Sequence, residues 1–407
     1  MTTQKQWMSK RLLAAVLAAG LGGLMGSPVP ARAQNVPQAQ LEEALAATMR
    51  RYDAPGGVLL LSGPDDPPQI AAAGLAERAQ RRPVTPNTRF HVASTGKMMT
   101  AVAALQLVQE GKIALDSPVL PLIDLPGAAR LPNIATATVG DLLSHRSGVP
   151  DCLRNAKTPN PRHPNPHWTA AEALTSAPCG APTKPGSYAY SNTNFILLGR
   201  IVEKMDRRPL AESLAARVFR PAGMTATTLG ANWTGTNRVE ANLAHGYRAA
   251  AKKGGQREDA SAYAYSSPLG DAPVTTTAAD LDRFMTALFR RPGLLLRPET
   301  LAAMLEDRAG EESDDGYGYG VAVEDSDWGK KYGHPGRLAG FRCEAWHFPE
   351  QDRTIILILN GDENGPDDVG VRLARALLPP PPPPAAPPTD SLILAAPPPD
   401  SLELKEK

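Results

Sequence analysis

Apolar and polar positions follow different periods along the chain, and this separates strand-rich ends from a helical middle. Short apolar runs rich in β-branched residues, such as TIILILN, predict buried strands, whereas apolar residues three or four positions apart predict amphipathic helices. The elements predicted in chain order are a helix over Gln38–Arg51, strands over 57–62 and 69–74, mainly helices from 94 to about 300, strands over 317–323, 340–348 and 354–360, and a closing helix over about 367–378. This order predicts an α+β fold (an α/β sandwich), in which both chain ends build one antiparallel sheet flanked by helices, with an inserted mainly helical subdomain.

Two motifs indicate where helices begin in the middle region. Thr169-x-x-Glu172 and Thr277-x-x-Asp280 each place an acidic residue three positions after a threonine. This spacing is typical of a capping box, in which two side chains satisfy free backbone N–H groups at a helix start. We therefore expect a helix after Thr169 and another after Thr277.

The N-terminal segment has the organisation of a secretory signal peptide. It begins with a basic region that contains Lys5, Lys10 and Arg11, and an apolar run over 12–25 follows. The A-x-A cleavage signal Ala31-Arg32-Ala33 then precedes Gln34. The alternative is a buried or membrane-spanning helix, but a bilayer span needs about 20 apolar residues. We expect residues 1–33 to be removed, the mature protein to begin at Gln34, and its location to be periplasmic or secreted. No cysteine lies near the cleavage site, so a lipid anchor is not indicated, and no later stretch could span a membrane.

The C-terminal segment differs in composition from everything before it. Six consecutive prolines begin at Pro379, and more follow among small and polar residues. Such a segment cannot bury a core and favours extended polyproline conformations. We therefore expect 34–378 to form the domain and 379–407 to be a disordered tail whose deletion leaves activity intact.

The net charge limits which binding partners are expected, and the cysteines bear on whether the protein contains a disulfide. Lys plus Arg total 43 against 42 for Asp plus Glu, so no electrostatic attraction to nucleic acid or anionic lipid is expected. The three cysteines are Cys152, Cys179 and Cys343. Export permits disulfides, and a Cys152–Cys179 bridge would close the Pro-rich segment between them. The alternative is three separate buried thiols.

Ser94 and Lys97 form the first candidate for chemistry. The apolar positions after them keep a helical spacing up to Glu110, before Gly111, which places Ser94 in the first turn of a helix. Side chains three positions apart on a helix share a face. A lysine shielded from water can lose its proton more readily and accept the proton of a neighbouring serine hydroxyl. S-x-x-K alone also occurs by chance on solvated surfaces.

Two further groups of candidate residues lie later in the chain. Tyr190 and Asn192 follow a Pro-Gly turn, where a phenol could relay a proton and an amide could bind a substrate carbonyl or the lysine. His334 and Gly336 form an H-x-G triplet beside the C-terminal strands, where the glycines at 336 and 340 would let a substrate backbone approach. Each group alone is also compatible with an ordinary loop or a structural histidine.

Taken in order, S-x-x-K, Y-x-N and H-x-G resemble the serine β-lactamase and penicillin-binding-protein superfamily, in its class C-like branch. Other matching segments, which extend the resemblance over about 40–378, are TVGDLLSHRSGVP, VFRPAGMTAT, DAPVTTTAADLDRF and YGYGVAV. The resemblance implies a β-lactamase/transpeptidase-like fold and an acyl-enzyme mechanism without metal or cofactor.

The resemblance also assigns roles to individual residues. It makes Ser94 the nucleophile, Lys97 its proton acceptor and Tyr190 the proton relay to the leaving group. Asn192 would bind substrate and Lys97, while His334 and Gly336 would line the substrate site. Backbone N–H groups of Ser94 and Arg337 would form the oxyanion hole.

Two departures from the family pattern bear on the substrate. His334 replaces the third-motif lysine, and Pro335 removes a hydroxyl that could bind a substrate carboxylate. Both favour an esterase or D-amino-acid peptide hydrolase over a β-lactamase. Arg337 and Arg342 could instead bind a carboxylate, which keeps a D,D-carboxypeptidase or weak β-lactamase as the alternative; otherwise both arginines are solvated or ion-paired.

Other classes of protein have less support. His163 and His167 are separated by prolines and do not form a helical zinc motif, and the G-x-S-x-G of α/β-hydrolases is absent. A non-catalytic peptidoglycan-binding protein with this fold is the remaining alternative. The intact Ser94, Lys97 and Tyr190 argue against it.

Overall fold

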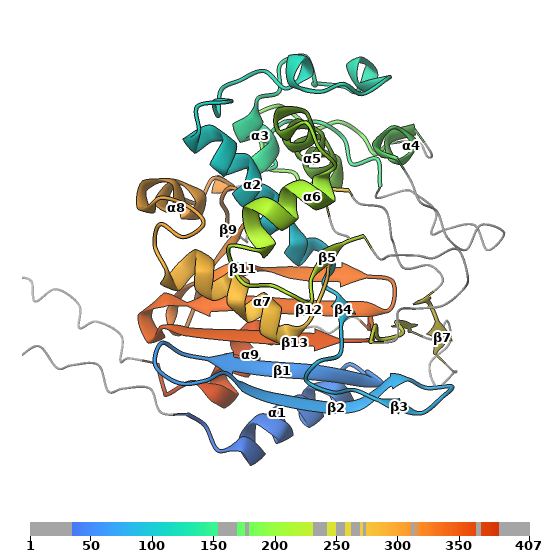
Figure 1. Ribbon diagram of the computed structural model, residues 1–407, viewed down its shortest axis with the longest axis vertical. Helices are drawn as coiled ribbons and strands as arrows, with labels where there is room; N and C mark the ends of the chain where they lie inside the picture. Colours follow the sequence, from blue (N-terminus) through green and yellow to red (C-terminus); the bar gives the residue numbers. More distant parts are fainter. Residues whose placement is uncertain are drawn as a thin grey trace, which may run out of the picture. The chain divides into compact units, whose positions relative to one another are not determined.

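Eight strands of the described chain form one antiparallel sheet in the order β3-β2-β1-β13-β12-β11-β10-β9. The computed structural model describes residues 35–153, 169–175, 179–230, 242–249, 257–261, 269–271, 274–310, 313, 316–363 and 368–381. The strands of this sheet are β1 Gly56–Ser62, β2 Gln69–Glu77, β3 Arg82–Pro83, β9 Gly316–Tyr317, β10 Ala322–Ser326, β11 Gly329–Leu338, β12 Phe341–Phe348 and β13 Arg353–Leu359. Both ends of the domain therefore contribute to the sheet, as the sequence predicts (Figure 1).

The neighbouring strands β1 and β13, in the interior of the sheet, face protein on both sides. β1 and β13 are buried at every position and pair with Leu60 opposite Ile356. Because successive side chains of a strand point to opposite faces, Leu60 and Ile356 enter one hydrophobic cluster while Leu59 and Leu357 enter the other. The continuous apolar runs in these strands are the sequence signature of this two-sided burial.

Helices cover both faces of the sheet. α1 and α9 contribute to the cluster around Leu59, while α2, α5 and α7 contribute to the cluster around Leu60 (Figure 1). The helix bounds are α1 Gln38–Arg51, α2 Lys97–Gln109, α3 Val139–Leu143, α4 Ala170–Thr175, α5 Asn192–Asp206, α6 Leu210–Leu214, α7 Ala278–Met285, α8 Pro298–Leu305 and α9 Val369–Leu377. The predicted α+β class is confirmed: helices flank an antiparallel sheet, and most of them come from the middle of the chain.

Two small sheets join the helical region to the large sheet. One has the order β4-β8-β5 and comprises β4 Phe90–His91, β8 Val274–Thr276 and β5 Thr228–Leu229. The other pairs β6 Tyr247–Arg248 with β7 Glu258–Asp259. β4 leads directly into the turn that carries Ser94, so its pairing with β8 fixes where that turn begins.

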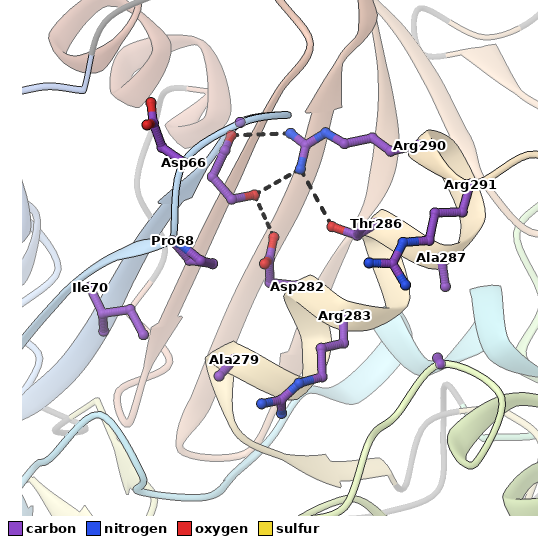
Figure 2. A pocket seen from close by; sticks show the side chains of 13 residues that line it. Asp66, Pro68, Ile70, Ala279, Asp282, Arg283, Thr286, Ala287, Arg290 and Arg291 are labelled. Carbon is purple, nitrogen blue, oxygen red and sulfur yellow. Dashed lines mark hydrogen bonds between the residues drawn. The ribbon is translucent and has the colours of Figure 1, made fainter.

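A polar network attaches α7 to the end of β1. α7 continues as a π-helical turn over Thr286–Arg290. Arg290 donates to the carboxylate of Asp352 at 2.6 Å and to Ser62 Oγ at 3.0 Å. Figure 2 shows Arg290 and Asp282 on the wall of a pocket of about 420 Å³ between α7 and the segment after β1. The Arg290 guanidinium donates its hydrogen bonds to other residues of this chain, so we interpret the network as structural.

Most predicted elements are confirmed, and two strand predictions need correction. The helix over 38–51 is α1, and the strands expected over 57–62, 69–74, 340–348 and 354–360 are β1, β2, β12 and β13. The strand expected over 317–323 is two strands, β9 and β10, because Gly320 turns the chain between them with a φ of 76°. β11 is not predicted, because its glycines and proline are residue types depleted in strands.

The helix-start predictions are confirmed in full at one site and in part at the other. The Glu172 N–H donates to Thr169 Oγ1 at 3.2 Å, and the Thr169 N–H donates to the Glu172 carboxylate at 2.8 Å. Thr277 also caps its helix, accepting the Asp280 N–H at 3.1 Å. The Asp280 carboxylate, however, accepts from the Ala226 N–H at 2.7 Å instead of completing the box.

Cys152 and Cys179 form a disulfide, which confirms the predicted pairing, and Cys343 is free and buried. Among the described residues, no helix combines the length and apolar character needed to cross a membrane. The predicted signal peptide, the His163/His167 pair and the tail beyond Pro381 lie outside the described residues.

Candidate functional site

Ser94 lies in a tight turn between β4 and α2. The turn is a 3₁₀ helix over Ala93–Gly96, so Ser94 precedes the α-helix instead of occupying its first turn. Ala93 has a φ of 50°, in the left-handed region that non-glycine residues rarely adopt. Ser94 remains half-exposed although its neighbours Thr95 and Lys97 are buried. The nucleophile predicted from the sequence is therefore partly accessible to solvent, although the residues beside it are buried.

β11 packs directly against the Ser94 turn. Thr95 Oγ1 donates to the carbonyl of His334 at 3.1 Å. A Cβ at Gly336 would lie 2.1 Å from the Val92 carbonyl oxygen, so only glycine permits this approach. Gly336 thus allows β11 to pack beside the nucleophile. The space next to this glycine is filled by Val92 and Thr95, so it is not room for a substrate backbone.

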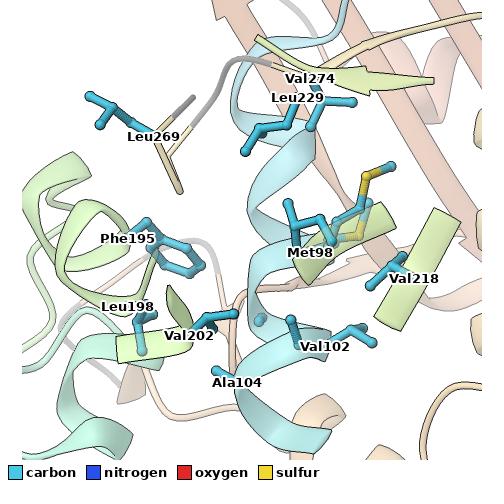
Figure 3. Packing of buried hydrophobic residues seen from close by; sticks show 14 of the residues in the cluster. Met98, Val102, Ala104, Phe195, Leu198, Val202, Val218, Leu229, Leu269 and Val274 are labelled. Atoms are coloured by element: carbon cyan, nitrogen blue, oxygen red, sulfur yellow. The ribbon is translucent and has the colours of Figure 1, made fainter. Parts of the chain in front are cut away.

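Hydrophobic packing holds α2 in place behind the nucleophile. Figure 3 shows Met98 and Val102 of α2 among Phe195, Leu198 and Val202 of α5. All five side chains are fully buried. α2 carries Lys97 and α5 carries Asn192, so this packing sets the distance between two of the predicted site residues.

Lys97 is fully buried and makes three hydrogen bonds. Its Nζ lies 3.2 Å from Ser94 Oγ, 2.7 Å from Asn192 Oδ1 and 2.6 Å from the Asp271 carbonyl oxygen. Burial lowers the pKa of Lys97 to about 8, although the carboxylates of Asp271 and Asp151 oppose the shift. Burial likewise raises the pKa of Asp271 to about 6, and Lys97 opposes that shift. The lysine can therefore lose its proton near neutral pH and accept one from Ser94.

Tyr190 lies over Lys97 on the open side of the site. Lys97 Nζ is 5.1 Å from the centre of the Tyr190 ring. The residue as a whole is 36% exposed, yet desolvation raises the pKa of Tyr190, and a hydrogen bond with Ser94 opposes part of that rise. Its phenol thus keeps its proton at neutral pH. Ser94 is in contact with a lysine that can become a base and a tyrosine that stays an acid.

Asn192 begins α5 and links Lys97 to an acidic residue. Its Oδ1 accepts from Lys97, while its Nδ2 donates to the Asp151 carboxylate at 3.0 Å. Asp151 was not among the residues selected from the sequence. It follows the SHRSGVP segment directly, and its position after a matched family segment was the available signal.

His334 is buried and electrically neutral. Its Nδ1 lies 2.6 Å from the Pro335 carbonyl oxygen, which can only accept, so Nδ1 carries the proton. Its Nε2 then accepts from the Tyr317 hydroxyl at 3.1 Å. Burial lowers the pKa of His334 to about 3, with Lys97 contributing to the shift. The third motif consequently presents no cation.

The side chains of the two arginines proposed as carboxylate binders do not lie beside Ser94 and His334. Arg337 is exposed and, three positions after His334 on β11, projects from the opposite face of the sheet. Arg342 is buried, pairs with Glu344 at 2.9 Å and lies 4.5 Å from the ring centre of Tyr52. Neither guanidinium supplies the charge that His334 lacks, which corrects that hypothesis.

Sequence reasoning also missed His145 and Tyr317. His145 Nδ1 accepts from the Ser191 N–H at 3.2 Å, and its ring centre lies 4.3 Å from that of Tyr190. Tyr317 lies 4.9 Å from His145 and 6.3 Å from Tyr190, ring centre to ring centre. Both belong to segments that resemble the family, SHRSG and YGYG, but a motif alone does not say which of its side chains face the site.

The described part of the chain holds no set of side chains suited to bind a metal ion. None of its His, Cys, Asp and Glu side chains gather in groups of three or more that could hold a metal ion. The polar atoms around Ser94 bond to one another: amine to amide, amide to carboxylate and phenol to imidazole. This arrangement suits nucleophilic catalysis by a serine hydroxyl.

Known proteins are similar to this chain in fold and, at 27–28% identity, in sequence. The D-aminopeptidase of Brucella ovis is 27% identical over 363 residues, covering 82% of this chain and 61% of that protein. The chain thus spans less than two thirds of the length of this relative. A penicillin-binding protein from Bacillus halodurans has a TM-score of 0.67 and 28% identity, covering 81% of this chain and 98% of the other. A D-stereospecific amidohydrolase from Streptomyces sp. has a TM-score of 0.69 and 27% identity, covering 83% and 98%.

A family model described as Beta-lactamase matches residues 41–378. The match includes Ser94, Lys97, Tyr190, Asn192 and His334, and it ends where the Pro-rich segment begins. Together with the superfamily resemblance of the three motifs and the similarity of the fold, it establishes the relationship predicted from the sequence. The chain belongs to the beta-lactamase family.

Proposed function

We propose that this protein is a serine hydrolase that forms an acyl-enzyme on Ser94 and cleaves amides and short peptides of D-amino acids that carry a free α-amino group. The observation that carries the proposal is the neutral His334, whose Nε2 is occupied by Tyr317. A β-lactam or D-Ala-D-Ala substrate has a carboxylate that requires a cation or hydroxyl donor beside the third motif. An α-ammonium group has no such requirement.

The charges near Ser94 favour the same substrate class. The carboxylates of Asp151 and Asp271 lie close enough to Lys97 to influence its pKa. Once Lys97 loses its proton, these two groups leave the site negative. A negative site attracts a substrate ammonium and repels a substrate carboxylate.

The two partners of Ser94 divide the proton transfers between them. Lys97, with a pKa near 8, takes the proton from Ser94 Oγ as the oxygen attacks the amide carbon. Tyr190, with a raised pKa, keeps its proton and can deliver it to the departing amine. In the second step the deprotonated Tyr190 takes a proton from the water that attacks the ester carbon of the acyl-enzyme, and Lys97 returns its proton to Ser94 Oγ as the bond to the acid breaks.

Charge on the carbonyl oxygen must be stabilised during both steps. We assign this role to the backbone N–H groups of Ser94 and Arg337, since β11 packs on the Ser94 turn through Gly336. Asn192 would bind the substrate carbonyl while it holds Lys97. Removing one such oxyanion donor from a hydrolase typically costs about 10²–10³ in kcat.

The activities for which two relatives are named support the stereochemical part of the proposal. The Brucella ovis relative is a D-aminopeptidase and the Streptomyces relative is a D-stereospecific amidohydrolase. This chain covers only 61% of the former, so its activity requires its own test. Small activated esters should also react, because their leaving groups need no protonation.

The nucleophile is tested with a fluorophosphonate probe and mass spectrometry. The wild type should gain one adduct, and peptide mapping should place it on Ser94. Ser94→Ala should show none, Lys97→Ala almost none, and Tyr190→Phe should slow amide turnover by about 10²–10⁴. A correctly folded wild type that takes up no probe would support the non-catalytic peptidoglycan-binding alternative instead.

The substrate class is tested with matched amides. We expect D-alanine amide and D-phenylalanine amide to be hydrolysed much faster than their L-enantiomers, and N-acetylation to reduce kcat/KM strongly. A D-Ala-D-Ala peptide and nitrocefin should be poor substrates. Faster hydrolysis of the D-Ala-D-Ala peptide than of D-alanine amide would make the protein a D,D-carboxypeptidase.

We also propose that the protein is exported, with cleavage after Ala33. Mass spectrometry of protein recovered from the periplasm or culture medium would show Gln34 as the first residue. Protein that retains residues 1–33 would contradict this.

A further inference from the structure

Asp151 stands behind Asn192 in a line of polar side chains that ends at the nucleophile. The Asp151 carboxylate accepts from Asn192 Nδ2 at 3.0 Å, and Asn192 Oδ1 accepts from Lys97 Nζ at 2.7 Å. Lys97 Nζ in turn lies 3.2 Å from Ser94 Oγ. In this chain of hydrogen bonds Asp151 does not contact Ser94 itself. It influences the reacting atoms through Asn192 and Lys97.

The carboxylate determines which way the Asn192 amide points. An amide side chain can turn over and exchange its oxygen and nitrogen, but a carboxylate can only accept hydrogen bonds. Asp151 therefore holds Nδ2 toward itself, which leaves Oδ1 toward Lys97. In the opposite orientation an NH₂ group would face the lysine ammonium and could not hold it.

Contacts on both sides fix Asp151. Its other carboxylate oxygen accepts from the Leu153 N–H at 3.0 Å, and its carbonyl accepts from the Gly180 N–H at 3.0 Å. The next residue, Cys152, donates its N–H to Thr193 Oγ1 at 2.9 Å, beside Asn192 in α5. The disulfide from Cys152 to Cys179 joins this short segment to the residue before Gly180.

We propose that Asp151 is a positioning residue for the Ser94–Lys97 pair, and that the Cys152–Cys179 disulfide keeps Asp151 in place. The proposal rests on the proposed function, in which Lys97 deprotonates Ser94. It adds a residue outside the three motifs and gives the disulfide a role in the chemistry as well as in stability.

Asp151→Asn tests the charge and the orientation together. The carboxylate raises the pKa of Lys97, so its removal should move the pH midpoint of Ser94 labelling downward by about one unit. The rate at the high-pH plateau should fall by about 10-fold or more, because Asn192 is no longer held in one orientation. Asp151→Glu, which keeps the charge, should restore the midpoint.

Other titratable groups that face Lys97 keep their identity in these variants, although loss of the Asp151 charge also lowers the pKa of Asp271 and of Tyr190. The groups that face Lys97 are Asp271, Tyr190, His145 and His334. Burial lowers the pKa of His334 to about 3 and that of His145 well below its usual range, so neither imidazole titrates in the window of the experiment. A moved midpoint would therefore report the loss of the Asp151 charge.

The matched control is Asp325→Asn. Asp325 makes an exposed ion pair with Lys330 at 2.9 Å, and its side chain is 84% exposed. The same chemical change there should leave both midpoint and plateau as in the wild type. A merely structural effect of Asp151→Asn would lower the fraction of labelled protein without moving the midpoint, and that result would overturn the proposal.

The disulfide arm uses a double-mutant cycle. Cys152→Ser/Cys179→Ser should lower the plateau rate by about 3–10-fold in the wild-type background, and by much less in the Asp151→Asn background, because the two changes act through one contact. Equal losses in both backgrounds would show that the disulfide acts independently and would contradict its assigned role. If Asp151→Asn alone folds poorly, Asp151→Ser, which also removes the carboxylate and keeps a small polar side chain, takes its place in the cycle.

Failure of this inference and failure of the proposed function give different results. A wild type without labelling at Ser94 would overturn both. A wild type that is labelled, with an Asp151→Asn profile that superimposes on it, would overturn the role of Asp151 and leave the serine hydrolase proposal intact.

Discussion

The phenol of Tyr317 donates a hydrogen bond to Nε2 of His334 across 3.1 Å, and both side chains are buried. Burial raises the pKa of Tyr317, so the phenol remains a donor. The imidazole lone pair is consequently bonded within the protein, and the position that corresponds to the lysine of the family's third motif is neutral here. In the proposed function, this contact is the reason that the site does not favour carboxylate-ended substrates.

Restoring a cation at this position should change substrate preference. We expect His334→Lys to raise the ratio of kcat/KM for a D-Ala-D-Ala peptide over D-alanine amide by about tenfold or more, since a hydrogen bond to a charged group contributes about 1.5–3 kcal/mol. Steady-state kinetics on both substrates measure the ratio. His334→Gln, which keeps an acceptor for Tyr317 without adding charge, is the control and should leave the ratio unchanged.

The rate of Ser94 acylation should rise with pH through about 8. The protonated amine of Lys97 has no lone pair, so below its pKa of about 8 the rate should fall about tenfold for each pH unit. His334, with a pKa of about 3, should add no inflection between pH 6.5 and 8. Probe labelling from pH 6.5 to 10 measures the profile. A profile that is flat over this range would exclude Lys97 as the base.

The order of the three motifs made most of the site predictable from sequence. Ser94, Lys97, Tyr190 and Asn192 come together in the structure, and each of their two motifs lies at the start of a helix or on the loop before it, whereas H-x-G lies on β11. Continuous apolar runs likewise located β1 and β13, because such runs are typical of strands that are buried on both faces. These features depend on local sequence, and local sequence is sufficient to find them.

The parts that sequence did not predict depend on contacts between distant segments. Asp151 and Asn192 are 41 positions apart, and nothing near either residue indicates their hydrogen bond. β11 escaped prediction because its glycines serve close packing, as Gly336 does against Val92, and glycine lowers strand propensity. Arg342 looked accessible from the sequence, yet register places it beneath Tyr52 on the other face of the sheet.

The C-terminal tail should be dispensable beyond its first residues. Trp328 Nε1 donates to the Pro379 carbonyl at 2.7 Å, which ties the start of the tail to the end of β10. A chain ending at Pro381 keeps this contact and should match the full-length protein in activity and melting temperature. A chain ending at Leu378 loses it and should be less stable by about 1 kcal/mol, with activity retained. Loss of folding in the shorter chain would contradict the predicted domain boundary.

Lys331 should be important for stability and unimportant for catalysis. Its fully buried side chain lies on β11, with Nζ 2.5 Å from Glu324 and 2.7 Å from Asp368, over the ring of Trp346. Asp368 also caps α9, accepting the Val371 N–H at 3.0 Å, so the lysine ties that helix to the sheet.

Lys331→Met keeps the side-chain length but leaves two carboxylates facing each other without their cation. Removing one partner of a buried ion pair costs about 3–5 kcal/mol, which should appear as a lower denaturation midpoint with an unchanged m-value. The neighbouring Lys330→Met removes only an exposed pair with Asp325 and should cost less than about 1 kcal/mol. Adding Glu324→Gln to Lys331→Met should recover part of the loss, because one of the two unpaired charges is gone. Equal stability of the two methionine variants would show that the Lys331 cluster does not hold α9 on the sheet.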